Sequence, residues 1–418
     1  MYINREIEKQ IKPFLNRKEI IAIIGPRQAG KTTFLLYLQK ELEKSGKSVK
    51  FLTFEKKEDL DLFQKNIEDF KDLYQQYQVV IIDEFQYAKQ GGKKIKYLFD
   101  TTKIKFIISG SSSLDLTFQT GKYLVGRIFN FTLLPFSFRE YLAYTDKQIY
   151  SLLLKRMPDI SFLNFRLKQS FGEVINKKLE KLFENYLVWG GYPSVILAKT
   201  NQEKQKILES ISEGYLLKDI RILLQLATED ELTRLIKFLA NQIGNLVEYK
   251  ELSNSSGLLH KDLKRHLQIL QQTYIIDLIK PFFTNKRTEL VKNPKVYFFD
   301  SGLRNFVISD FRPCSERDDI GRLVENYVFN VFSRRATVLE SLKFWRTKSK
   351  AEVDFIIQNR QAVIPIEVKY SSKPIIGKSL YSFIDKFSPK KAMVLTKGFI
   401  GEKKADGCKI QFIPVYYF

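Results

Sequence analysis

Residues 25–32 read Gly25-Pro-Arg-Gln-Ala-Gly30-Lys31-Thr32, and this stretch decides the fold of the segments around it. It follows the apolar run Ile20–Ile24, typical of a buried strand, and leads into Thr32–Lys44, whose apolar spacing predicts a helix. The stretch fits the pattern GxxxxGK[ST] at every constrained position. Glycines let a backbone wrap closely around phosphates, and the following helix N-terminus offers them free N–H groups. The sequence therefore predicts a phosphate-binding loop.

Within this loop, Lys31 is expected to reach the β- and γ-phosphates of a nucleotide, and the Thr32 hydroxyl to ligate Mg²⁺. ATP is favoured over GTP because no NKxD-like guanine-specificity motif is present. The residues expected to contact the nucleotide are Gly25, Pro26, Arg27, Gln28, Ala29, Gly30, Lys31, Thr32 and Thr33.

A second apolar strand, Val79–Ile82, ends in the acidic pair Asp83 and Glu84. Asp83 is suited to hold Mg²⁺ through its water shell, and Glu84 to orient or deprotonate the attacking water. Acidic residues at a strand end are weak evidence alone, but they gain weight about fifty residues after a phosphate-binding loop. ATP hydrolysis is therefore predicted, with Glu84 as a catalytic residue.

Two further residues complete the predicted nucleotide site, and each has a structural alternative. Ser111 follows the apolar strand Lys105–Ser109 and is expected to contact the γ-phosphate or the attacking water, unless it belongs to a simple turn. Arg127 is the candidate arginine finger for a neighbouring subunit's site, and a surface or structural arginine is the competing interpretation.

Strands alternate with helices in the N-terminal part, which predicts a parallel sheet covered on both faces. Later stretches are long and apolar-periodic, and from Asn245 two short helices followed by a two-stranded wing are indicated. The overall fold class is α/β. The predicted segments are a nucleotide-binding core at 1–145, a helical lid at 146–244, a winged helix-turn-helix at 245–300 and a second α/β domain at 301–418, with further core strands at Val49–Phe54 and Lys105–Ser109.

A second candidate site lies in the C-terminal segment. The stretch that begins at Glu352 alternates polar and apolar residues, and after a short turn the chain returns through Glu367 and Lys369. Side chains two apart on a strand share a face, and a tight hairpin brings Asp354 within about one rung of Glu367. Two carboxylates and a lysine suit Mg²⁺-assisted phosphodiester hydrolysis, with Asp354 and Glu367 as metal ligands. A surface salt-bridge cluster is the alternative.

Composition limits the number of domains, the class of partner and the kinds of chemistry that this chain can have. With 418 residues the chain is too long for one compact core, and its net charge of +22 favours polyanionic partners, nucleic acid first. Biased codon usage is the competing explanation of that charge. Two cysteines and two histidines exclude a disulfide framework and clustered imidazole chemistry. No signal peptide and no apolar run of about 18 residues is present, so a cytoplasmic protein without membrane contact is expected.

Two basic stretches are candidates for nucleic-acid contact. Cations interleaved with aromatic residues can grip a backbone and stack on bases, although a solvated loop with one buried tryptophan fits the same pattern. A basic predicted recognition helix can contact phosphates, although winged helices also dock proteins. The residues are Lys343, Phe344, Trp345, Arg346, Lys348 and Lys350 in the first stretch, and Lys261, Lys264, Arg265 and His266 in the second.

The motifs GPRQAGKTT, VVIIDEFQ, IISGSSS, GRIFNFTLLPFSFREYL, WGGYP and AEVDF…IPIEVKYS occur in this order over nearly the whole chain. The ordered series resembles archaeal and bacterial AAA-type P-loop ATPases that carry a C-terminal restriction-endonuclease-like domain. The resemblance implies an AAA core, a helical lid, a winged helix and a PD-(D/E)XK fold. It maps Asp354, Glu367 and Lys369 onto metal and catalytic positions, with Glu325 as the acidic residue that often completes the metal site. It also implies a homo-oligomer, such as a hexameric ring.

The leading hypothesis is therefore an ATP-driven, DNA-directed machine whose C-terminal domain cleaves or processes DNA with Mg²⁺. The alternative is a nucleotide-dependent switch or scaffold whose C-terminal domain binds nucleic acid or a protein without cutting. An RNA substrate is a third option, because charge alone does not separate RNA from DNA.

Overall fold

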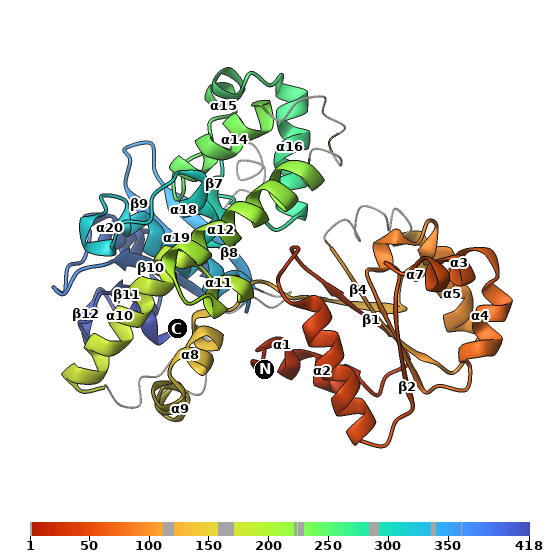
Figure 1. The fold of residues 1–418 in the computed structure, drawn as a ribbon. Helices are drawn as coiled ribbons and strands as arrows, with labels where there is room; N and C mark the ends of the chain where they lie inside the picture. The colour runs from red at the N-terminus through yellow and green to blue at the C-terminus, as the bar shows by residue number, and fades with distance from the viewer. Residues whose placement is uncertain are drawn as a thin grey trace. The chain divides into compact units, whose positions relative to one another are not determined.

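A computed structural model of the protein describes residues 2–111, 121–157, 171–220, 224, 230–283, 292–335, 340–360 and 362–418. The chain forms two compact units (Figure 1). The first unit runs to Phe136 and includes Gln272–Tyr274, and the second unit comprises Ser137–Gln271 and Ile275–Phe418. Each unit is described by itself.

The first unit is built on a parallel five-stranded sheet with the order β2-β3-β4-β1-β5. The strands predicted at 49–54, 79–82 and 105–109 are confirmed to within one residue at each end, whereas β5 was not predicted. The bounds are β1 (Ile20–Ile24), β2 (Val49–Thr53), β3 (Val79–Asp83), β4 (Lys105–Gly110) and β5 (Ile128–Thr132).

Helices cover both faces of this sheet, as the buried strands require (Figure 1). Alternate side chains of β1 enter opposite cores, so Ile21 packs in the cluster with Phe34, while Ala22 packs in the cluster with Phe63. Helices α1 and α2 supply the first cluster, and α3, α4 and α5 supply the second. The bounds are α1 (Ile7–Ile11), α2 (Lys31–Lys44), α3 (Lys57–Lys65), α4 (Ile67–Tyr74), α5 (Gly91–Thr101) and α7 (Gly121–Leu124).

The second unit begins with helices, as the sequence predicted for this region. Ser137 and Glu140 form a capping box that starts α8, and Phe138 packs edge-on against Phe183 of α10. Because α8 packs on α10, the first unit closes at Phe136, before the predicted boundary at residue 145. The bounds are α8 (Phe138–Thr145), α9 (Lys147–Arg156), α10 (Glu173–Trp189), α11 (Pro193–Leu197), α12 (Asn201–Ile211) and α14 (Asp230–Asn241).

The segment predicted as a winged helix-turn-helix contains two helices followed by an antiparallel strand pair, in the predicted order. These are α15 (Tyr249–Ser256), α16 (His260–Gln272), β6 (Ile276–Ile279) and β7 (Lys295–Phe298). Past the end of β6, Pro281 forms a bridge with Phe344, and the Phe282 amide donates to the Phe344 carbonyl at 2.5 Å. The strand pair is thereby joined to the edge of the C-terminal sheet.

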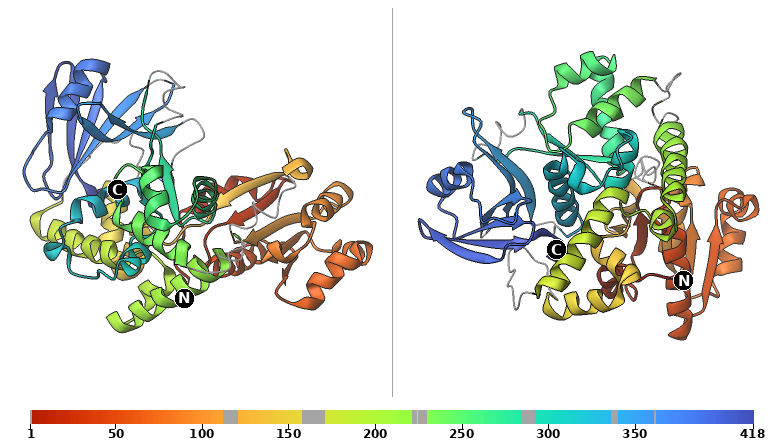
Figure 2. Two further views of the ribbon diagram at one scale, coloured as in Figure 1. Left: turned by 90° about the horizontal axis from the view of Figure 1, so that it is seen from above. Right: turned by 60° about the vertical axis from the view of Figure 1, so that its left-hand side comes forward.

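A mixed six-stranded sheet with the order β12-β13-β11-β10-β9-β8 forms the C-terminal part, and Figure 2 shows it from two further sides. Helix α20 packs on β9 and β10, and α19 contacts β7 and β10. The bounds are α18 (Ser301–Val307), α19 (Ile320–Ser333), β8 (Ser341–Arg346), β9 (Glu352–Gln358), β10 (Val363–Lys369), α20 (Lys378–Phe387), β11 (Lys391–Thr396), β12 (Gly401–Ala405) and β13 (Cys408–Pro414).

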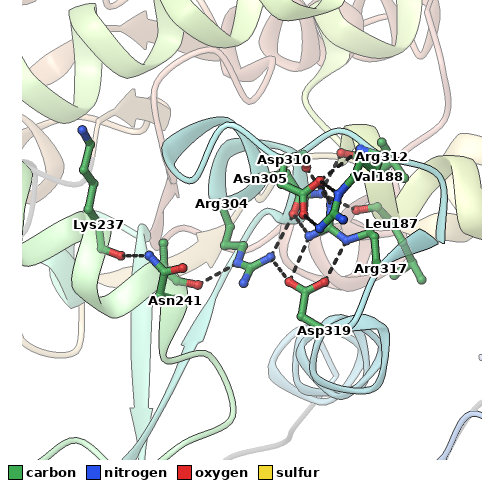
Figure 3. A network of polar contacts seen from close by, with 11 residues as sticks. Leu187, Val188, Lys237, Asn241, Arg304, Asn305, Asp310, Arg312, Arg317 and Asp319 are labelled. Atoms are coloured by element: carbon green, nitrogen blue, oxygen red, sulfur yellow. Dashed lines mark hydrogen bonds and ion pairs between the residues drawn. The ribbon is translucent and has the colours of Figure 1, made fainter. Parts of the chain in front are cut away.

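A buried polar network fixes α18 and the start of α19 (Figure 3). The Arg304 side chain donates to the Ala240 carbonyl at 2.7 Å and to Asp319 at 2.5 Å. Arg317 binds the same Asp319 carboxylate at 2.8 and 2.9 Å, and the Asn305 amide donates to two carbonyls at the end of α10. These bonds position the helix that carries Glu325.

Cys314 and Cys408 are buried free thiols. Burial raises the pKa of Cys314 to about 12, so this thiol stays protonated at neutral pH. In the parts of the chain that the structure describes, no helix has both the length and the apolar character needed to span a membrane.

Candidate functional site

The phosphate-binding loop owes its path to two glycines. Gly25 has φ +153°, and a Cβ there would lie 2.1 Å from the Leu133 carbonyl oxygen. Gly30 has φ +91° and caps the N-terminus of α2. A side chain at either position would be strained, so the loop requires glycine at both positions.

Lys31 begins α2 and folds back over the loop. Its ammonium group donates to the carbonyls of Gly25 at 3.1 Å and Pro26 at 2.9 Å. Burial lowers the pKa of Lys31 to about 8, although the nearby carboxylates of Glu84 and Asp83 raise it. The lysine therefore lies between the loop and the acidic end of β3, where a cation can neutralise phosphate oxygens.

Asp83 brings together hydroxyl groups from two other elements. The Thr32 hydroxyl donates to Asp83 Oδ2 at 2.6 Å, and the Ser109 hydroxyl donates to Oδ1. The strand order places β4 between β1 and β3, which is why Ser109 reaches Asp83. Hard oxygen atoms from Thr32 and Asp83 converge on one point, which fits the ligand chemistry of Mg²⁺.

Glu84 follows Asp83 in the left-handed region, with φ +54°. Its amide donates to the Ser109 hydroxyl at 3.3 Å, and its carboxylate accepts from the Gln86 amide. Ser111 is buried, and its predicted contact with the γ-phosphate or the attacking water stays a prediction. The hydroxyl that binds Asp83 belongs to Ser109. A polar residue inside the otherwise apolar strand Lys105–Gly110 was the signal that sequence reasoning passed over.

The remaining loop residues differ in exposure. Pro26 and Ala29 are buried, whereas Arg27, Gln28 and Thr33 point to solvent. Sequence reasoning missed Arg5, a buried side chain that donates to the Ala29 carbonyl at 3.0 Å and to the Leu134 carbonyl at 2.5 Å. Arg5 therefore supports the backbone of the loop, and no sequence motif indicated this role.

Arg127 has a partner within its own chain. Its Nε donates to Asp100 at 3.0 Å, and its guanidinium lies 5.9 Å from the centre of the Phe99 ring. About a third of the side chain is exposed. The predicted role in a neighbouring subunit's site stays a prediction.

In the C-terminal sheet, the hairpin register brings the predicted residues together. Ile366 pairs with Phe355, and one further step of the same register places Glu367 opposite Asp354. Lys369 binds Glu367 at 3.0 Å, and the Val368 amide donates to Asp354 at 2.7 Å. Burial raises the pKa of both carboxyl groups, although Lys369 opposes that shift.

Glu325 projects from α19 into a set of contacts that the sequence did not reveal. Lys295 of β7 binds Glu325 at 3.1 Å and Glu352 at 2.6 Å, and the Tyr297 hydroxyl also donates to Glu325. Burial raises the pKa of Glu325 to about 7. Burial lowers the pKa of Lys295, but Glu325, Asp354 and Glu352 together raise it above its ordinary value. Because β7 is distant in sequence, no local pattern pointed to Lys295.

The three-carboxylate metal site expected from Glu325, Asp354 and Glu367 needs correction. Among the described residues, no group of three or more histidine, cysteine or acidic side chains is arranged to hold a metal ion. Glu325 is instead engaged by Lys295 and Tyr297. Mg²⁺ is usually held by one or two carboxylates with waters and substrate phosphates, and the facing pair Asp354 and Glu367 fits that requirement.

Helix α16 presents cations to solvent, but not all the predicted ones. Lys261, Lys264 and Arg265 are exposed. His266 is only 2% exposed, and its Nδ1 lies 2.6 Å from the Asp262 carbonyl. Burial lowers the pKa of His266, so the ring is neutral at pH 7 and the prediction that it contacts phosphate is wrong.

Comparison with known proteins divides the chain into three segments. Residues 17–142 match the family model described as an AAA domain. This segment is AAA-type ATPase-like, as predicted. Residues 180–313 and 320–418 match two domains of unknown function, DUF8612 and DUF4143. The nuclease-like fold of residues 301–418 therefore stays a prediction.

Similar proteins occur in distant organisms. An uncharacterized protein of Methanocaldococcus jannaschii is 24% identical over 376 residues, which cover 86% of this chain and 76% of that protein. An uncharacterized protein of Haemophilus influenzae is 24% identical over 375 residues, covering 87% and 85%. Among solved structures, AMPPCP-bound DnaA from Aquifex aeolicus is 14% identical and covers 65% of this chain and 90% of its own, with a TM-score of 0.29. At that TM-score the likeness carries no inference about function.

Proposed function

We propose that this chain hydrolyses ATP at the loop of residues 25–32 and couples the reaction to Mg²⁺-dependent cleavage or processing of DNA by its C-terminal sheet. The observation that carries the ATP reaction is the 2.6 Å contact between the Thr32 hydroxyl and Asp83, beside the buried Lys31. A loop, a cation and two oxygen ligands, one from the start of α2 and one from the end of β3, meet at one place, as phosphoryl transfer requires.

Each residue has a defined task in this proposal. The loop amides and Lys31 bind the β- and γ-phosphates, and Thr32 and Asp83 supply oxygen ligands for the metal. Bound Mg²⁺ supplies charge stabilisation at the phosphate oxygens. Glu84 orients the attacking water and accepts its proton, and Ser109 holds the Asp83 carboxylate in place through its hydrogen bond.

Steady-state ATP turnover and nucleotide titration test this proposal. We expect Lys31→Ala to lose nucleotide affinity, and Glu84→Gln to bind ATP but turn it over ~100-fold or more slowly, since a positioned base contributes about that much. Lys40→Ala is the matched control, because Lys40 is an exposed lysine on the same helix. Unchanged affinity and turnover in Lys31→Ala would remove the ATPase assignment.

Cleavage by the C-terminal sheet rests on Asp354, Glu367 and Lys369. Two facing carboxylates suit one divalent cation. The Lys369 ammonium group, 3.0 Å from Glu367, can stabilise the charge on the phosphate in the transition state. The wider cluster holds the carboxylates of Glu325, Glu352, Asp354 and Glu367 against the cations Lys295, Lys369 and Arg346. When all are ionised, four negative charges minus three positive charges leave one negative charge for a metal to neutralise.

Labelled DNA incubated with protein and Mg²⁺ tests the cleavage step. Cuts are expected from the unaltered protein and not from Asp354→Ala or Lys369→Ala. Asp385→Ala and Lys390→Ala are matched controls, because both residues are exposed in the same part of the chain. Equal cutting by all five proteins would show a contaminating nuclease.

The switch or scaffold alternative also has an observation in its favour. The carboxylates Glu325, Asp354 and Glu367 already have hydrogen-bond or ion-pair partners, so no metal is needed to hold these side chains in place. Full DNA binding without cleavage under Mg²⁺, Mn²⁺ or Ca²⁺ would favour this alternative.

DNA contact and assembly complete the proposal. The exposed cations Lys261, Lys264 and Arg265 on α16 and the net charge of +22 support a polyanionic partner. A winged-helix role for residues 245–300 predicts that Lys264→Gln weakens duplex binding and reduces its salt dependence. A homo-oligomeric ring predicts a larger sedimentation coefficient with ATP than without it.

A further inference from the structure

A groove in the second unit combines aromatic rings with basic side chains. It has a volume of about 730 Å³ and lies where the chain leaving β6, the end of β8 and the end of α20 come together. Phe282, Trp345 and Phe387 line it, and Lys292, Lys348 and Lys386 stand around them. Its size is that of a small-ligand site rather than a packing defect.

The aromatic part of the groove is held in a fixed arrangement. Phe387 packs edge-on against Phe282 with ring centroids 5.3 Å apart, and nearly perpendicular to Trp345 at 6.2 Å. Trp345 is only 3% exposed, which agrees with the alternative of one buried tryptophan rather than a tryptophan that stacks on bases, whereas Phe387 is half-buried. One ring is therefore held by its neighbours and partly open to a ligand.

The charged part of the groove is entirely of one sign. No carboxylate lines it in the described part of the chain, and none there pairs with Lys292, Lys348 or Lys386. The fourth cation, Arg346, is held by Glu352 at 2.9 Å. Three ammonium groups without a carboxylate partner, one of which (Lys386) lies 5.4 Å from the centre of the Phe387 ring, favour a ligand that carries both negative charge and flat rings.

The groove is continuous with the candidate catalytic sheet. Arg346 lines the groove, and its partner Glu352 lies two residues before Asp354 on β9. Lys295, which binds Glu352 and Glu325, lies 5.5 Å from the centre of the Phe344 ring, another part of the lining. A chain seated in the groove would therefore run alongside the carboxylates.

We propose that this groove binds single-stranded nucleic acid, with a base stacked on Phe387 and the backbone held by Lys348, Lys386 and Lys292. The proposal rests on the proposed function, because it names the form in which the substrate reaches Asp354. Bases in a duplex are already stacked and paired, so their faces are unavailable to Phe387, whereas unpaired bases stack readily on aromatic rings. An acidic peptide would satisfy the lysines but not the ring.

Fluorescence anisotropy with the full-length chain tests the groove. The background is Asp354→Ala, which prevents cutting, and the probes are labelled single strands of dT and of rU and a duplex of the same length. The double variant Lys348→Gln/Lys386→Gln should weaken single-strand binding about tenfold and reduce the salt slope by about 1.4, with duplex binding unchanged. Lys390→Gln/Lys404→Gln is the matched control, because these two exposed lysines lie in the same unit without lining the groove.

A second variant separates stacking from charge. Phe387→Ala should weaken single-strand binding about tenfold without changing the salt slope, because stacking releases no counterions. If Phe387→Ala fails to fold, the double lysine variant still decides the question. Single-strand binding equal to that of the Lys390→Gln/Lys404→Gln control, equal losses on the duplex, or displacement by poly-glutamate as effective as by the oligonucleotide would each overturn the proposal.

The same samples separate the groove from the cleavage reaction. Cutting is measured in the chain that retains Asp354. Groove-dependent binding without any cutting supports the groove and counts against the nuclease. Cutting that persists at full rate on single strands in the double lysine variant counts against the groove and leaves the nuclease in place.

Discussion

The loop of residues 25–32 and the hairpin that carries Asp354 and Glu367 are both candidate phosphate-chemistry sites, and they are built differently. In the first, Thr32 and Asp83 place oxygen atoms 2.6 Å apart, and Lys31 is bonded only to backbone carbonyls. In the second, Glu367 is already paired with Lys369, and Asp354 accepts a backbone amide.

That difference separates a site fixed by backbone from a site fixed by ion pairs. The geometry of the loop depends on glycines that are packed against main-chain atoms. A side chain added at such a glycine would clash, because the main chain cannot shift to accommodate it. The hairpin site is set by buried charges whose partners can exchange when a metal or phosphate arrives. The first should therefore respond to steric change, and the second to charge and pH.

The largest effect is expected from alanine at the one glycine in each site that faces a close neighbour. A Cβ on Gly25 would lie 2.1 Å from the Leu133 carbonyl oxygen, and a Cβ on Gly377 would lie 2.3 Å from Glu367 Oε1. The Leu133 amide is itself bonded to Ile24, so this backbone cannot yield. Gly25→Ala should weaken ATP binding at least ~100-fold, the equivalent of about 3 kcal/mol.

Gly377→Ala should do less, because the Glu367 side chain can shift. We expect roughly a tenfold slower cut with ATP turnover unchanged. Gly321→Ala is the control for both, since a Cβ there meets nothing within 4 Å. The contrast between backbone and ion-pair sites is refuted if Gly377→Ala proves as damaging to its site as Gly25→Ala does to the loop.

Much of the loop site was predictable because its chemistry is local. Gly25 to Thr32 are contiguous, and the apolar strand before Asp83 marks where its carboxylate must emerge. Ser109 was missed because its role depends on β4 lying between β1 and β3, and strand order is not encoded in any single strand. Arg5 was missed because its contacts with the Ala29 and Leu134 carbonyls likewise join parts of the chain that are distant in sequence.

In the hairpin site, the sequence predicted only the residues that lie on the hairpin itself. The short turn fixed the register of Asp354 against Glu367, so that pair follows from sequence. Lys295 reaches the carboxylates from β7, which the chain places there through long-range packing. The sequence left open whether the aromatic residues Phe344 and Trp345 are exposed or Trp345 is buried, and both are buried, because α20 and the chain after β6 pack there.

The next largest effect concerns the support of α19. Arg304 is buried, and its removal would leave Asp319 and the Ala240 carbonyl without that donor. Arg304→Ala should lower the free energy of unfolding by about 1.5–3 kcal/mol, as expected for the loss of charge-assisted hydrogen bonds, because Arg317 still neutralises Asp319. Arg312→Ala is the control: its side chain is 54% exposed in a pair with Asp310, so its removal is expected to change the stability little.

Tryptophan fluorescence during urea unfolding measures this loss. Both tryptophans of the chain, Trp189 and Trp345, lie in the second unit, so their signal reports on that unit alone. ATP affinity should be unchanged in Arg304→Ala. Equal midpoints for the Arg304 and Arg312 variants would show that the network of Figure 3 contributes little.

A smaller effect should distinguish the hairpin site by its response to pH. Burial raises the pKa of Glu325 from 4.5 to about 7, so between these values the folded chain keeps a proton that the unfolded chain has released. Stability supplied by that proton is complete below pH 4.5 and is lost as pH rises through about 7. The loss is on the order of 1–3 kcal/mol.

Glu325→Gln removes this group from the titration and leaves Lys295 with Glu352. Its urea midpoint, read by tryptophan fluorescence from pH 5 to 8, should fall less with rising pH than that of the unaltered chain. Parallel curves would mean that Glu325 does not hold its proton. The affinity of the loop for ATP should not distinguish the two proteins at any of these pH values.

The smallest effect is expected at Arg127, where the loop unit itself contains an exposed ion pair. Arg127 and Asp100 are each more than a third exposed, so their pairing should contribute little to stability. If the pair is only structural, Arg127→Ala and Asp100→Ala lose the same small amount of stability and both retain ATP turnover.

An arginine finger predicts a different result. Arg127→Ala alone would lose about 1000-fold in ATP turnover, because the guanidinium would be needed on a neighbouring subunit's γ-phosphate while Asp100 would not. Since the side chain is bonded within its own chain, we expect the equal, small losses, and a turnover assay at several protein concentrations separates the two outcomes.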